Sequence, residues 1–273
     1  METSMMTSRR GLLYAAGALP VAALAGCAHQ PSRDQRTHFV LVHGAWHGAW
    51  CWNKVIPRLR ERGHQVTAVD LPGRWIQPSA MASIKAEDYA RVVEQVVRNS
   101  DRPVVLVGHS LGGATVSMVA ETCSSQVRRS VYLSAFLVPN GASVGAVASK
   151  DKGTLIPRAV LRDAVTNTSS INPAFAREVF YGDCTAEDIR IALQLLSPEP
   201  GVMNRHQLNL SAQAYGKVDR AYIECTLDRA ISIETQREMQ AASPCSRVIT
   251  LQASHSPFLS QPAEVANALL QLA

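Results

Sequence analysis

The sequence predicts an α/β fold with a doubly wound, mostly parallel sheet, and three observations carry this prediction. Short runs of β-branched and aliphatic residues have the length of fully buried strands. Segments with helical spacing follow these runs in alternation. Glycines and prolines separate the segments. Strands that alternate with helices in this way are typical of a parallel sheet with helices on both faces.

The first half of the predicted core alternates regularly between the two kinds of element. Its strands are apolar runs closed by a glycine or by a Leu-Pro-Gly turn, and its helices carry apolar residues three and four positions apart. Gly63 ends one helix, and Pro103 separates the next helix from the strand that follows it. The expected elements are strand 38–44, helix 50–62, strand 65–70, helix 86–99, strand 104–107 and helix 114–120.

After a further strand the alternation pauses and then resumes near the C-terminus. The expected elements are strand 129–135, strand 220–225, helix 232–241, strand 247–251 and helix 262–272. Residues 141–216 interrupt the alternation of strands and helices, because they have no strong strand, contain several prolines and carry one good helix at 186–196. The core is therefore expected at 38–140 and 217–273. The segment 141–216 is expected to be an inserted, mainly helical cap over the active site, with a merely decorative insertion as the alternative.

The first 27 residues have the features of an export signal. A twin-arginine pair at 9–10 precedes an apolar stretch at 11–26, which contains a proline and is short for a membrane span. The stretch ends in Leu-Ala-Gly-Cys at 24–27, which resembles a bacterial lipoprotein box with Cys27 as the lipidated residue. We expect a periplasmic or cell-envelope protein, held on a membrane only by this anchor through a polar tether at 28–37. Cleavage without lipidation is the alternative.

The composition excludes several functional classes. Hydrophobic residues make up 47% and charged residues 18% of the chain, as in an ordinary globular protein with ample core. The net charge of +5 is dilute and no basic run is present, so no nucleic-acid partner is expected. The five cysteines after Cys27 have neither C-x-x-C spacing nor clustered histidines, so no metal site is expected. Because five is odd, they cannot all pair in disulfides.

A Gly-x-Ser-x-Gly motif at 108–112 lies between a predicted strand and a predicted helix. In this context the motif acts as a nucleophile elbow. The two glycines let neighbouring backbone approach a sharp, strained turn. The turn exposes the Ser110 hydroxyl and places the Leu111 N–H at a helix N-terminus, where developing negative charge is favoured. Ser110 is therefore the predicted nucleophile, and a chance occurrence of the motif in a loop is the alternative.

A serine nucleophile needs a base and an acid that orients the base. Asp228 and His255 each come just beyond a predicted strand, where the catalytic loops of an open α/β sheet emerge. Asp219 precedes its strand and Glu224 lies inside the same strand, so neither competes well. The chain order Ser, Asp, His predicts that Ser110, His255 and Asp228 form a catalytic triad.

The loop after the first strand is expected to complete the site. Gly44 permits a turn there, and the Ala45 N–H can point inward beside the Leu111 N–H, so that both form an oxyanion hole. Of the tryptophans in this stretch, those at 50 and 52 are expected to pack in the core. The residues assigned to the substrate pocket are Gly44, Trp46 and His109.

A resemblance to a known family is carried by residues 38–52, 107–113, 180–196 and 222–228, with Gln236 after the last of them. These stretches resemble the plant methylesterase and hydroxynitrile lyase branch of the α/β-hydrolase superfamily. The resemblance covers nearly the whole chain from residue 38 onward and implies the α/β-hydrolase fold. The chain also resembles bacterial esterases that act on aryl, short-chain or pyrethroid esters. The region 144–172 matches this branch poorly.

The resemblance also separates two activities of this branch. The lyases have a threonine after the first-loop histidine and a lysine directly after the catalytic histidine, which bind the cyanohydrin hydroxyl and the departing cyanide. Here these positions are Gly44 and Ser256, so no cation follows His255. We therefore expect a cofactor-free carboxylesterase that acts on a small hydrophobic or aryl ester through an acyl-enzyme. The alternatives are a lyase with the same triad, a haloperoxidase-like enzyme or thioesterase, and a non-catalytic ligand-binding relative.

Overall fold

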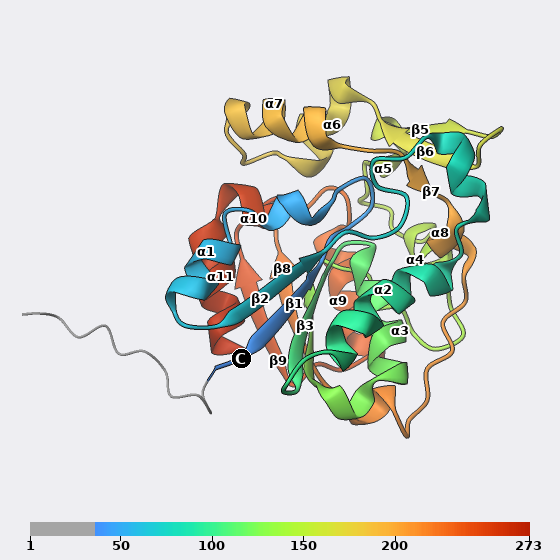
Figure 1. Cartoon of the computed structure of the whole chain (residues 1–273). Coiled ribbons are helices and arrows are strands. Elements are labelled where there is room, and N and C mark those ends of the chain that lie inside the picture. Colours follow the sequence, from blue (N-terminus) through green and yellow to red (C-terminus); the bar gives the residue numbers. More distant parts are fainter. Residues whose placement is uncertain (1–35) are drawn as a thin grey trace, which may run out of the picture. The chain divides into compact units, whose positions relative to one another are not determined.

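A computed structural model of the chain describes residues 36–273. The predicted export signal with Cys27, and residues 28–35 of the predicted tether, lie outside the described residues. Figure 1 shows that the described part is built on a twisted sheet with helices on both faces.

The main sheet is parallel throughout. Its strands are β1 (His38–Val42), β2 (Gln65–Val69), β3 (Val104–His109), β4 (Val127–Leu133), β8 (Asp219–Cys225) and β9 (Arg247–Leu251). They lie in the order β2-β1-β3-β4-β8-β9, and each neighbouring pair is parallel. The predicted α/β class is therefore confirmed. Since all strands run the same way, their carboxyl ends meet at one edge, where loops can build a site.

The inner strands β1, β3, β4 and β8 are largely buried on both faces, which explains their apolar runs, whereas the edge strands β2 and β9 are partly exposed. Successive side chains of a strand point to opposite faces. The helices of the two faces are α1 (Ile56–Glu61), α2 (Ala86–Arg98), α3 (Gly112–Thr122), α9 (Ile233–Ala242), α10 (Pro257–Ser260) and α11 (Pro262–Gln271). In β1, Val40 and Val42 belong to the core under α2 and α3, whereas Phe39 and Leu41 belong to the core under α1 and α11.

One predicted helix is divided in two. The segment 50–62 forms a 3₁₀ helix at Ala49–Trp52 and then α1, which begins at Ile56. Pro57 lies in the first turn of α1, where its missing N–H is tolerated, so the helix starts there rather than continuing from Trp50. Trp52 is fully buried at the break, as expected for a packing residue. The described 3₁₀ helices are Ala49–Trp52, Pro78–Ser83, Ser124–Gln126 and Tyr215–Lys217.

Residues 141–216, called the insertion below, connect β4 to β8. The insertion is mainly helical, as expected, but it has more helices than the one predicted at 186–196 and three short strands where no strong strand was expected. The insertion contains an antiparallel sheet of β5 (Val160–Asp163), β6 (Thr168–Ile171) and β7 (Glu199–Pro200). Its helices are α4 (Val144–Ala148), α5 (Ile156–Ala159), α6 (Pro173–Phe180), α7 (Ala186–Leu195) and α8 (Val202–Arg205). Strands of four residues or fewer are too short to show an alternating pattern.

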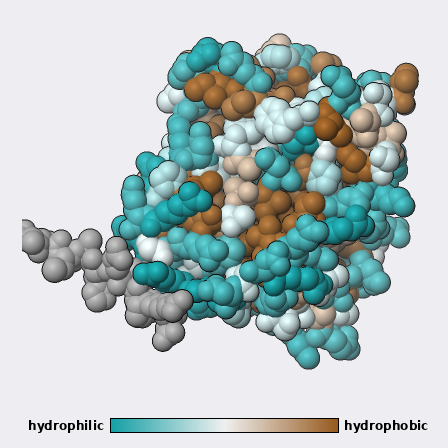
Figure 2. Space-filling model, in the orientation of Figure 1, coloured by the Kyte–Doolittle hydropathy of each residue, from teal (hydrophilic) through white to brown (hydrophobic). Residues whose placement is uncertain are grey.

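The surface is that of an ordinary globular domain. Figure 2 shows hydrophilic residues over much of the visible face, with hydrophobic areas between them. None of the helices in residues 36–273 has the length and apolarity needed to cross a bilayer. The five cysteines of this range are free thiols, and no group of three or more metal-binding side chains occurs among the same residues.

Candidate active site

Ser110 occupies a strained turn between β3 and α3. Its backbone φ is 51°, in the left-handed region that non-glycine residues seldom adopt. The glycines of the motif are required by close packing. A Cβ on Gly108 would lie 2.8 Å from the Gly112 carbonyl oxygen, and a Cβ on Gly112 would lie 2.5 Å from the His43 carbonyl oxygen. The turn therefore has the tight strand–turn–helix geometry that the motif predicts.

Asp228 and His255 lie together beyond the ends of β8 and β9. The His255 Nδ1 lies 2.7 Å from the Asp228 Oδ2, and both side chains are almost completely buried. The other carboxylate oxygen, Oδ1, accepts hydrogen bonds from the N–H groups of Ala230 at 2.7 Å and Ile231 at 3.0 Å. These two bonds fix the carboxylate, so its Oδ2 can hold the imidazole with Nδ1 protonated.

Two further side chains support Asp228, and neither has a role predicted from the sequence. Ser134, directly after β4, donates a hydrogen bond from its hydroxyl to the Asp228 Oδ2. Gln236 of α9 donates to the same oxygen at 3.3 Å and to the Ile231 carbonyl at 2.8 Å. A polar residue at the carboxyl end of a strand is a usable signal for Ser134. Gln236 is one of the residues on which the family resemblance rests, but no local sequence pattern predicts its hydrogen bond to Asp228.

His109 links the serine turn to His255. The His109 Nε2 lies 2.8 Å from the His255 carbonyl oxygen, and the two ring centroids are 4.7 Å apart. Burial holds the pKa of His109 well below its usual value, so the ring is neutral and donates this bond through Nε2–H. Within the described residues, the Ser110 hydroxyl and His255 make no hydrogen bond to each other. Such bonds commonly tighten only in the substrate complex.

Ala45 and Leu111 border the same cavity as Ser110. Both residues are buried, and neither backbone N–H has an acceptor within residues 36–273. Buried N–H groups are rarely left without a partner. An oxygen atom bound beside Ser110 could therefore accept from these two groups.

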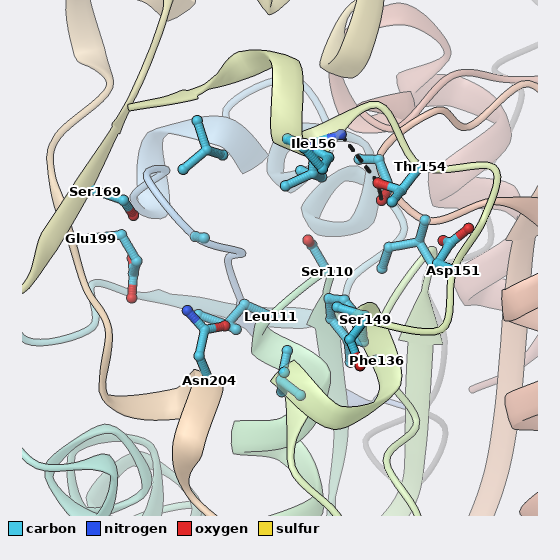
Figure 3. A pocket seen from close by; sticks show the side chains of 18 of the residues that line it. Ser110, Leu111, Phe136, Ser149, Asp151, Thr154, Ile156, Ser169, Glu199 and Asn204 are labelled. Carbon is cyan, nitrogen blue, oxygen red and sulfur yellow. Dashed lines mark hydrogen bonds between the residues drawn. The ribbon is translucent and has the colours of Figure 1, made fainter. Parts of the chain in front are cut away.

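The cavity has a volume of about 310 Å³ and lies between the core and the insertion. In Figure 3, Ser169 and Glu199 line one side of it, Asp151 and Thr154 lie on the opposite side, and Ser110 lies between them. Most of the other lining residues are apolar. The wall includes, from the core, Trp46, Leu111, Phe136, Ala230 and Ile231, and from the insertion, Val144, Ala148, Ile156, Pro157 and Val160.

Only one of the three residues assigned to the pocket lies on this wall. Trp46 lines the cavity, whereas Gly44 and His109 do not. Gly44 packs behind Ser110, where a Cβ would lie 2.7 Å from the Ser110 Cβ. His109 has no exposed surface, because its ring packs against His255 and Phe258. These two residues support the neighbouring groups instead of facing the cavity.

The acidic residues that the sequence disfavoured have structural partners. Asp219, at the start of β8, pairs with Arg129 at 2.6 Å. Glu224, inside the same strand, pairs with Arg237 at 2.9 Å. Both lie away from the cavity wall.

Comparison with known proteins shows similarity over most of the chain. Residues 39–268 match the model of the "Alpha/beta hydrolase family". Methylesterase 9 of Arabidopsis thaliana is 32% identical over 251 residues, which are 86% of this chain and 98% of that protein. Polyneuridine aldehyde esterase of Rauvolfia serpentina is 32% identical over 256 residues, covering 87% and 96%. The crystal structure of a pyrethroid hydrolase from Sphingobium faniae matches with a TM-score of 0.79 and 28% identity, covering 86% of this chain and 96% of that one.

Proposed function

Because the chain belongs to the alpha/beta hydrolase family and is an esterase-type hydrolase of its methylesterase branch, we propose that it is a serine carboxylesterase. The substrate class is small hydrophobic or aryl esters. The observation that carries the proposal is the Asp228–His255 hydrogen bond of 2.7 Å beside a serine on a strained turn. The serine faces a mostly apolar cavity of about 310 Å³, a size suited to a small organic molecule.

In the proposed mechanism, Ser110 attacks the ester carbonyl carbon. The His255 Nε2 accepts the hydroxyl proton as the bond forms, and Asp228 stabilises the imidazolium through Nδ1–H. The carbonyl oxygen becomes an oxyanion, which the Ala45 and Leu111 N–H groups bind. Each such donor typically contributes about 3 kcal/mol of transition-state stabilisation.

The tetrahedral intermediate then collapses to an acyl-enzyme. His255 gives its proton to the departing alkoxide oxygen, so the alcohol leaves neutral. Water attacks the acyl carbon next, with His255 again accepting the proton, and the same two N–H groups bind the second oxyanion. Return of the proton to the Ser110 oxygen releases the carboxylic acid and restores the site.

The surroundings of the site disfavour the lyase alternative. A threonine in place of Gly44 would need space that the Ser110 Cβ, 2.7 Å from the Gly44 Cβ position, already fills. Ser256, which follows His255, is fully buried and carries no charge. The described site therefore has no cation at this position to bind a departing cyanide.

The test compares the purified chain with its Ser110→Ala variant on p-nitrophenyl esters of increasing acyl length. We expect turnover by the wild type and a loss of at least a thousandfold in the variant. Ser125→Ala, which changes an exposed serine of a 3₁₀ helix, is the matched control and should retain full activity. Absence of ester turnover, or equal turnover by Ser110→Ala, would refute the proposal. Cleavage of mandelonitrile without ester turnover would establish the lyase instead.

A further inference from the structure

We propose that Glu199 of the insertion is a positioning residue for the oxyanion hole, because it holds the backbone next to Ala45. This inference rests on the proposed function and extends it. Ala45 and Leu111 belong to the core, whereas the residue that fixes the direction of the Ala45 N–H belongs to the insertion.

Glu199 is a buried carboxylate in a fixed arrangement. Its side chain is 5% exposed and forms an ion pair of 2.7 Å with Arg74, whose side chain is 2% exposed. Its other oxygen, Oε1, accepts a hydrogen bond of 2.7 Å from the Tyr89 hydroxyl. Burial and the neighbouring carboxylate raise the pKa of Tyr89, so the hydroxyl remains a donor. A buried charge with such partners has little freedom to move.

The remaining contact of Glu199 is made to the loop that carries Ala45. The Glu199 Oε2 accepts a hydrogen bond of 3.1 Å from the Trp46 N–H, across 153 positions of sequence. Trp46 has a backbone φ of 62°, an unfavourable conformation for a bulky residue. Conformations of this kind persist only where the surroundings hold them.

The insertion also holds the other polar groups of Trp46. The Ser197 N–H donates to the Trp46 carbonyl at 2.9 Å. The Trp46 indole Nε1–H donates to the Ser169 carbonyl and hydroxyl, both at 3.2 Å. Figure 3 shows Ser169 and Glu199 on the same side of the cavity. The strained conformation of Trp46 is thus maintained by three residues of the insertion.

Holding Trp46 limits the freedom of Ala45. The Trp46 N–H and the Ala45 carbonyl belong to one planar peptide group. Glu199 fixes the N–H side, and the His47 Nδ1–H donates to the carbonyl oxygen at 2.9 Å on the other side. The His47 ring is held by the Tyr181 hydroxyl at 2.8 Å. The Ala45 N–H lies one Cα away, so its direction depends on this peptide plane.

This role differs from recognition of substrate by Glu199. Both carboxylate oxygens already accept hydrogen bonds, from Trp46, Arg74 and Tyr89. A positioning residue should act on kcat, because a misdirected N–H weakens binding of the oxyanion more than binding of the uncharged ester. A substrate-binding residue should instead act on KM.

The experiment compares Glu199→Ala with Glu199→Gln in the full chain. For Glu199→Ala we expect kcat to fall about tenfold to a hundredfold with KM changed less than about threefold. Glu199→Gln keeps an oxygen for the Trp46 N–H and should retain kcat within about threefold. If Glu199→Ala does not fold, Arg74→Met/Glu199→Leu removes the acceptor without leaving a buried unpaired charge, and should show the same loss.

Inhibitor binding gives a second readout that stability alone would not change. An aryl trifluoromethyl ketone forms a tetrahedral adduct with a serine, whereas the corresponding alcohol cannot. We expect Glu199→Ala to weaken binding of the ketone by about the same factor as it lowers kcat. Binding of the alcohol should be unchanged. The matched control is Glu224→Ala, which removes another buried glutamate that is paired with an arginine and does not line the cavity. Its kcat should be unchanged.

Three outcomes would overturn the inference while the proposed function stands. These are unchanged kcat in Glu199→Ala, a rise in KM at constant kcat, or equal losses in Glu199→Ala and Glu199→Gln. The last outcome would assign the effect to the charge of the ion pair. A wild-type chain that neither hydrolyses esters nor binds the ketone would overturn the proposed function itself, before any variant is compared.

Discussion

Replacing Asp228 by asparagine should abolish most activity through a change of tautomer in His255. The Oδ1 position accepts two backbone N–H groups, so the amide oxygen must occupy it. The amide NH₂ then takes the Oδ2 position and faces the His255 Nδ1 at 2.7 Å, where two N–H groups would oppose each other. The imidazole relieves this conflict by moving its proton to Nε2. In that tautomer Nε2 cannot accept the Ser110 proton.

The expected loss in kcat is about 10⁴-fold, the size found where an asparagine imposes the wrong tautomer on a catalytic histidine. This corresponds to about 5.5 kcal/mol of transition-state stabilisation. The fold should survive, because the new side chain has nearly the same shape and keeps both backbone hydrogen bonds at Oδ1. KM should therefore change little.

The assay is steady-state hydrolysis of p-nitrophenyl esters, together with thermal unfolding of each variant. Asp219→Asn is the matched control, since Asp219 lies at the far end of β8 in an ion pair with Arg129. Its activity should equal that of the wild type. If Asp228→Asn retained more than a tenth of the wild-type kcat, the assignment of Asp228 as the orienting acid would be wrong.

Three other perturbations test separate features. Gly44→Ala places a Cβ 2.7 Å from the Ser110 Cβ and should lower kcat about a hundredfold, whereas Gly216→Ala, with no contact under 3.4 Å, should leave kcat unchanged. Ser134→Ala removes a hydrogen-bond donor to Asp228, so kcat should fall several-fold and the melting temperature, measured by calorimetry, should fall by a few degrees. Unchanged values would contradict the role of Ser134 in holding Asp228. Burial lowers the pKa of His47 from 6.5 to about 4. Since the unfolded chain then binds more protons at this residue between these values, His47 by itself should contribute roughly 2 to 3 kcal/mol to the fall in the free energy of unfolding as the pH drops from 7 to 4.5. Urea unfolding would measure this fall, and His47→Gln should make it smaller.

The elements encoded by local sequence were predictable. The strand β9 has the predicted bounds, Arg247–Leu251, because a short apolar run between polar loops fits no other element well. The turn at Ser110 was predictable because its serine and both glycines fall within five consecutive residues between a strand and a helix, although Gly112 also packs against the distant His43. The proximity of Asp228 and His255 follows from topology, since parallel strands end at one edge of the sheet.

The contacts that complete the site depend on distant parts of the chain. Ser134 meets Asp228 across 94 positions, and Trp46 meets Glu199 across 153. Ser134 and Asp228 meet because β4 and β8 are neighbours in the sheet, whereas Trp46 meets Glu199 because the insertion folds over the sheet. No sequence spacing predicts either approach. The strands β5, β6 and β7 were missed for a related reason. They are stabilised by pairing with one another, and no single strand is long enough to have a pattern of its own.

The residues with a left-handed backbone conformation bear on how this sequence can evolve. Of the five non-glycine residues with positive φ in residues 36–273, Trp46, Ser110 and Ser134 all border the candidate site. Each such residue costs roughly 1–3 kcal/mol relative to a relaxed backbone, and glycine would remove that cost. Backbone strain alone would therefore favour glycine at these positions. The same change would delete an indole that lines the cavity, the hydroxyl proposed to attack the ester and a donor to Asp228. Relief of backbone strain and activity thus select opposite residues at these positions.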